Sequence, residues 1–249
     1  MSRPAAPIRA VGALAAHELA LTARRGENVL VTILIPVAVL LFFGTVGAVP
    51  GIEGRPVDFL LPGVLALAMI ACAFVSLSIV TAYERTYGAL KRLGGAPLPA
   101  WGLVAAKAAA AVAMEAIQVA VLLAVAGLVL GWRLPESANL PVVALALILG
   151  TVAFAGLGLA LAGTLRAEAV LALANGLFLA CLVFGGIVVP LDVLPDGVAT
   201  AARLLPAAAL ADLLRAGLTG TPDGVGPAAV LVAWSLGAAV VAARTFRWD

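Results

Sequence analysis

Six long apolar runs, separated by short charged or turn-rich segments, most constrain what this chain can fold into. A helix needs about 20 mostly apolar residues to cross the hydrocarbon core of a bilayer. The runs have that length and cover residues 28–47, 59–82, 101–131, 140–163, 169–189 and 225–243. Lipid leaves unpaired backbone groups without partners, and the sequence lacks the alternating, turn-separated segments of a barrel. The runs therefore predict an all-α membrane protein with six transmembrane helices.

The composition agrees with a single membrane domain over residues 1–249. The chain is 64% hydrophobic and 11% charged, with a mean hydropathy of +1.17. A soluble domain of this length has far more charge, because its surface is in contact with water. The composition therefore excludes the soluble globular class.

The distribution of Lys and Arg predicts the orientation. Segments on the cytoplasmic side of a membrane carry an excess of these residues. With a cytoplasmic N-terminus, four of the 15 Lys and Arg residues fall outside, which leaves eleven inside. The four are Arg55, Arg133, Arg203 and Arg215. We expect a multi-pass protein of the plasma membrane with both termini in the cytoplasm, including the tail 244–249.

The first 27 residues predict an interfacial helix that leads into the first span. Ile8, Val11 and Leu19 share one helical face, whereas Arg9 and His17 lie on the other. An apolar face opposite a charged face is typical of a helix that lies in the membrane surface.

A charged segment after the second span predicts a docking surface. Tyr83, Tyr87 and Leu90 recur at helical spacing on one face, and Arg85 and Arg92 lie on the opposite face. A short helix with this pattern anchors in the interface and offers charge to a soluble partner. We expect the contact residues to be Tyr83, Glu84, Arg85, Tyr87, Gly88, Leu90, Lys91 and Arg92.

The stretch 190–224 before the last span predicts an outer re-entrant element at the surface. Four prolines, at positions 190, 195, 206 and 222, divide it into pieces too short to cross about 30 Å as helix. Its Asp and Arg residues would be costly at the centre of the bilayer. The stretch is therefore not expected to be a seventh span.

Polar residues inside the spans are candidates for function. Glu115 and Gln118 lie near the middle of the third span, and Lys107 is two turns earlier, where its stem can reach the membrane surface. For Glu115 we favour a packing role, because a lone carboxylate is a poor proton relay. Asn175 in the fifth span fits a packing role and a substrate pathway equally well.

Asn175 shares one helical face with Phe178 and Leu182, at i, i+3 and i+7. A polar amide beside an aromatic ring suits a mostly apolar pocket with one orienting group. The three residues are therefore the candidate substrate pathway.

Enzymatic chemistry is largely excluded by what the sequence lacks. His17 is the single histidine and lies outside the spans, so an intramembrane Ser–His pair is not available. The sequence contains no GxxxxGK[ST] phosphate loop and no metal-ligand spacing. We expect a non-enzymatic chain without its own metal or cofactor. A secondary transporter, a channel or a structural anchor remains an alternative on these observations.

The whole chain resembles the permease subunit of ABC exporters of the type-2 family, which includes drug, antibiotic and polysaccharide exporters. The order of an N-terminal helix and six spans agrees with that family. The motif residues that carry the resemblance are Glu84, Gly88, Leu90, Lys91, Arg92, Leu93 and Pro97, then GGIVVPLDVLP, Pro206, Arg215 and Gly220, and the tail residues Phe246, Arg247 and Trp248. Ala208 and Ala209 depart from the commonest version, which often has polar or aromatic residues there.

The resemblance implies a mechanism and partners. Two permease subunits, identical or not, would pair in a bacterial inner membrane with two cytoplasmic ABC ATPase subunits. ATP and Mg would bind to those ATPases, and the segment at 83–92 would be the coupling helix. The fifth spans of the two permeases would approach each other. The expected cargo is a hydrophobic drug, antibiotic or lipid-like compound, with a polysaccharide or glycolipid as the alternative, and no nucleic acid is expected as a partner.

Overall fold

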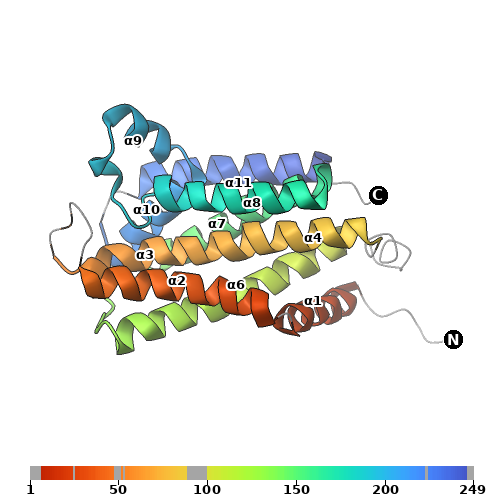
Figure 1. Cartoon of the computed structure of the whole chain (residues 1–249), viewed down its shortest axis with the longest axis horizontal. Helices are drawn as coiled ribbons and strands as arrows, with labels where there is room; N and C mark the ends of the chain where they lie inside the picture. Colours follow the sequence, from red (N-terminus) through yellow and green to blue (C-terminus); the bar gives the residue numbers. More distant parts are fainter. Residues whose placement is uncertain are drawn as a thin grey trace.

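A computed structural model describes residues 7–24, 26–47, 52, 54–88, 100–221 and 224–245, and all regular structure within them is helical (Figure 1). The first helices are α1 (Pro7–Arg24), α2 (Gly26–Val46), α3 (Pro56–Met69), the π-helix η1 (Ile70–Ser76), α4 (Leu77–Thr86) and α6 (Ala100–Leu128). The later ones are α7 (Leu140–Thr164), α8 (Ala167–Phe184), the 3-10 helix η2 (Leu191–Val193), α9 (Asp196–Arg203), α10 (Pro206–Thr219) and α11 (Val225–Thr245). The all-α membrane fold is confirmed.

Five helices in the described part of the chain are long and apolar enough to cross a membrane. They are Pro56–Thr86, Ala105–Leu128, Leu140–Thr164, Ala167–Phe184 and Val225–Thr245. Within α2, Thr32–Val46 forms a shorter apolar segment. The pair α9 and α10 is bent by 81° and reaches the length of a span only when both are taken together. The layout of six spans stays a prediction.

The long helices run side by side between two ends of the molecule (Figure 1). One end holds α1 and the last residues of α4 and α11, and we call it the α1 end. The other end holds α9, and we call it the α9 end. The helix α1 and the last residues of α11 therefore lie at the same end of the bundle.

Glycines in α7 let this helix pack closely against its neighbours, as their density in the sequence suggests. A Cβ atom on Gly156 would lie 2.9 Å from the Cβ of Ala238 in α11. One on Gly158 would lie 3.1 Å from the carbonyl oxygen of Phe74 in η1. Because real Cβ atoms almost never come within 3 Å of such atoms, a side chain at Gly156 would force α7 and α11 apart.

The chain folds back into the bundle between α8 and α9. Helix α8 ends at Phe184, five residues before the expected end of the span at residue 189, because Gly186 adopts a φ of +62° that other residues rarely adopt. A Cβ on Gly63 of α3 would lie 2.4 Å from the carbonyl oxygen of Ile187. Gly63 therefore gives the returning turn room to pack against α3.

The helix α10 is buried among other helices, a packing that its sequence did not indicate, while the outer re-entrant element stays a prediction. The helix packs on α3, α7 and α11, and most of its side chains are inaccessible. Its Ala- and Leu-rich sequence makes this possible, because small apolar residues allow close packing on three sides. At about 1.5 Å per residue, its 14 residues extend roughly 21 Å, less than the hydrocarbon core.

Candidate functional site

A groove on the side of the bundle is the candidate site for a transported molecule. It has a volume of about 360 Å³, which is within the range of small-molecule pockets. Three structural units form it: α2, the continuous helix from η1 into α4, and α8. The lining residues are Thr32, Ile35, Pro36, Ala71, Val75, Ser76, Ile79, Val80, Leu171, Asn175 and Phe178.

The groove is apolar apart from three uncharged polar residues, Thr32, Ser76 and Asn175, and no described residue that lines it is charged. The Asn175 Nδ2 atom donates a hydrogen bond to the Leu171 carbonyl at 2.8 Å, one turn earlier in α8. That bond uses one of the two amide hydrogens and leaves the amide oxygen as an acceptor. Asn175 can therefore orient a neutral ligand in an otherwise apolar groove.

One wall of the groove contains the π-helix η1. A π-turn inserts one additional residue per turn, is rare, and occurs often at functional sites. Ala71, Val75 and Ser76 belong to it and line the groove. The π-helix could not be predicted from the sequence, because its residues differ little from those of the α-helix that continues on both sides.

The structure brings together two of the three residues predicted for the substrate pathway. Asn175 and Phe178 both line the groove. Leu182 is one turn further along α8 and packs against the main apolar core instead. Thr32 and Ser76 were not predicted, because a hydroxyl group within an apolar run is common in spans and gives no signal by itself.

The first of the residues predicted to contact an ATPase lie in α4, at the α1 end of the bundle. Tyr83, Glu84 and Arg85 lie in the last turn of α4. This helix ends at Thr86, four residues beyond the expected end of the second span. Tyr87 and Gly88 follow in a turn, and the rings of Tyr83 and Tyr87 stack with centroids 6.0 Å apart. The remaining predicted residues, Leu90, Lys91 and Arg92, lie outside the described residues.

Arg85 and Gly88 have structural roles at this turn. The Arg85 guanidinium donates a hydrogen bond to the Leu165 carbonyl in the connection between α7 and α8. Gly88 has a φ of +69°, the left-handed conformation that commonly ends a helix. The helical pattern predicted an open charged face for Arg85, whereas its partly buried side chain links α4 to the connection between α7 and α8.

Lys107 binds two carboxylates from different helices. Its Nζ atom lies 3.2 Å from Glu18 Oε1 of α1 and 2.5 Å from Glu84 Oε2 of α4. Only 3% of the Lys107 side chain is exposed, so the ammonium does not simply reach out to the membrane surface. The partners are 89 and 23 residues away in sequence, which no local pattern could reveal.

Glu115 and Gln118 contact neighbouring helices. The hydroxyl group of Thr151, on α7, donates a hydrogen bond to Glu115 Oε2 at 2.6 Å. The Gln118 amide donates to the Thr32 carbonyl of α2 at 3.4 Å, next to the groove. Both are buried in the bundle.

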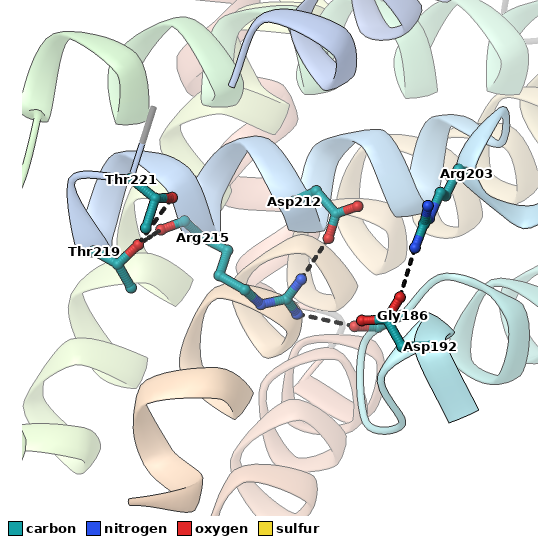
Figure 2. Close-up of polar contacts among 7 residues, drawn as sticks. All are labelled: Gly186, Asp192, Arg203, Asp212, Arg215, Thr219 and Thr221. Atoms are coloured by element: carbon teal, nitrogen blue, oxygen red, sulfur yellow. Dashed lines mark hydrogen bonds and ion pairs between the residues drawn. The ribbon is translucent and has the colours of Figure 1, made fainter. Parts of the chain in front are cut away.

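A second polar cluster, near α9, ties α10 to the returning turn (Figure 2). Arg215 of α10 contacts the Asp212 carboxylate at 2.5 Å and donates to the Gly186 carbonyl at 3.0 Å. Its guanidinium also lies 4.1 Å from the centre of the Phe59 ring. Arg203 of α9 pairs with Asp192 at 2.5 Å. The residues of these contacts line a cavity of about 580 Å³ at the α9 end. The contacts of Arg215 hold α10 beside this cavity.

Within the described residues, no group of three or more His, Cys, Asp and Glu side chains could hold a metal ion. The clusters can orient and couple helices, and the groove can bind a neutral molecule.

The sequence matches a known protein family. The sequence model of the family described as ABC-2 type transporter matches residues 9–219. A comparison with curated proteins finds no match to this chain.

Proposed function

The chain belongs to the ABC-2 type transporter family, whose members are the membrane component of ABC exporters and work with an ABC ATPase, and we propose that its cargo is a hydrophobic drug, antibiotic or lipid-like compound. The cargo would bind in the groove between α2 and α8 and leave the cell. A separate ATPase subunit would supply ATP hydrolysis, so ATP and Mg would bind in that partner chain.

The lining of the groove supports this class of cargo. An apolar surface with three uncharged polar groups favours a neutral, largely apolar molecule with one or two hydrogen-bonding groups. A polysaccharide or glycolipid carries many hydroxyl groups, and each would need a partner on leaving water. The described lining has too few polar groups for that, so we favour the drug-like or lipid-like cargo.

The assembly that we propose has two of these permeases, identical or not, and two cytoplasmic ATPases. The α1 end would face the cytoplasm of a bacterial cell, with α1 in the membrane interface. The ATPase would contact the segment that starts at Tyr83 and continues through Arg92. The second permease would face α8, whose large apolar side chains are widely exposed.

In this arrangement the α9 end faces outside. There α10 and the turn at Gly186 fill the bundle between α3 and α7. We propose that they form a re-entrant outer closure, which opens when ATP drives the permease to release its cargo.

We expect changes in the groove to alter the choice of cargo. Asn175→Ala removes the orienting amide, and Phe178→Ala removes aromatic surface from the same wall. Loss of one hydrogen bond or of part of an apolar contact costs about 1–3 kcal/mol, or roughly 5- to 150-fold in affinity for compounds that use it. ATP-dependent transport of a panel of neutral hydrophobic compounds should therefore show a changed ranking.

Leu236→Ala is the control, because Leu236 is exposed on α11, away from the proposed permease contact on α8, and does not line the groove. It should leave the ranking unchanged. If both groove variants lower transport of every compound equally, in step with the amount of folded protein, the assignment of the groove fails.

A further inference from the structure

The buried ion cluster of Glu18, Lys107 and Glu84 lies close to the groove. A small cavity of about 40 Å³ reaches Glu18 and Lys107 on one side of the helix that runs from η1 into α4. The groove lies along a neighbouring face of the same helix. Ser76 and Val80 line both spaces, so one helical wall separates a candidate cargo from the ion cluster.

The ion pairs join helices that otherwise have different packing partners. Helix α1 packs mainly on α6, and α4 packs mainly on α7, η1 and α8. Lys107, on α6, contacts a carboxylate from α1 and another from α4. Without the ammonium, two carboxylates would be left close together in a site that is mostly closed to water.

Conversion of the π-helix η1 to α-helix would change the arrangement of this wall. A π-turn contains one residue more than an α-turn, so conversion of η1 to α-helix would rotate and shift the helix that follows it. Glu84 is in that helix, two turns after Ser76. A shift of the wall would therefore move Glu84 relative to Lys107. Conversely, a displacement of Glu84 would shift the helix that forms the wall.

We propose that Lys107 is a positioning residue that couples the groove wall to α1 and to the end of α4. Its two ion pairs make α1, α4 and α6 move together when a partner moves α1 or the α4 end. The movement then reaches Ser76 and Val80 in the groove. This inference rests on the proposed function, because it assigns a role in transport to the cluster.

Two variants separate this role from simple neutralisation of charge. Lys107→Met keeps the length of the side chain but removes its ion pairs with Glu18 and Glu84. The triple variant Glu18→Gln/Lys107→Met/Glu84→Gln removes all three charges of the cluster together, so neither carboxylate of the cluster is left beside a missing ammonium. If Lys107 serves only to neutralise the carboxylates, the triple variant behaves like the wild type.

The first measurement uses the permease–ATPase complex in proteoliposomes and compares transport with ATP hydrolysis. We expect the triple variant to assemble and hydrolyse ATP, with cargo moved per ATP lower by about tenfold. The second uses spin labels at Ala16 of α1 and Thr86 of α4, both exposed, in a background with Cys72 and Cys181 replaced by Ala. The distance between the labels should be narrowly distributed in the wild type, with and without trapped nucleotide, and broad in the triple variant.

Wild-type transport per ATP together with a narrow distance distribution in the triple variant would overturn the proposal. The spin-label measurement needs no cargo. If no tested compound is transported by the wild type, the proposed cargo class fails, while the distances still decide whether Lys107 holds α1 and α4 together.

Discussion

Replacement of Arg215 by Met should destabilise the protein by about 2 kcal/mol, below the 3–5 kcal/mol typical of a broken buried pair, because the site is partly open to water. The variant leaves Asp212 without its ion pair and the Gly186 carbonyl without this donor. It also removes the cation that lies on the Phe59 ring. The apparent midpoint of thermal unfolding in detergent should fall by roughly 4–8 °C.

Arg203→Met is the matched control, because the Arg203–Asp192 pair has the same 2.5 Å separation but is largely exposed. The side chains of that pair are 58% and 82% exposed, compared with 21% and 33% for Arg215 and Asp212. Exposed pairs contribute about 0–1 kcal/mol. Equal losses in the two variants, or no loss in Arg215→Met, would show that the contacts of Arg215 do not hold α10 in place.

Charge reversal at the predicted coupling segment should weaken the contact with the ATPase. We expect the double variant Arg85→Glu/Arg92→Glu to lower co-purification of the ATPase at least about tenfold, because like charges across an interface cost several kcal/mol. Arg85 also supports the turn at Leu165, so its reversal should lower thermal stability as well. Arg92→Glu alone is therefore the cleaner test of the partner contact.

Arg133→Glu makes the same change of charge at an exposed position between α6 and α7. Arg133 is two residues from Gly131, whose carbonyl accepts a hydrogen bond from Arg55 of the cavity at the α9 end. This variant should leave co-purification unchanged if the ATPase binds at the α1 end. Full assembly and transport in the double variant would rule out this segment as the coupling contact.

The sequence predicted the helices well, because lipid permits few alternatives to them. The apolar run 59–82 is indeed part of one continuous helix, Pro56–Thr86. The shared helical face of Asn175 and Phe178 was also enough to place both on one groove. Such local periodicity survives folding, since a helix fixes which side chains point the same way.

What the sequence could not predict depends on contacts between distant segments. Glu18 is 89 residues from Lys107, and only the packing of α1 on α6 brings them together. The burial of α10 could not be predicted, because its prolines and charges argue only against a full span. The structure buries it by pairing Asp212 with Arg215 and by aligning small residues against α3 and α7.

The central claim is that an ABC ATPase drives export of a neutral hydrophobic compound through this chain. The most direct test is uptake of a fluorescent compound of that class into inside-out vesicles that contain the permease and its ATPase. Our account predicts uptake that requires both chains and ATP hydrolysis and that stops with vanadate. Uptake that continues without the ATPase and collapses when an ionophore removes the ion gradient would contradict it, and would indicate a secondary transporter.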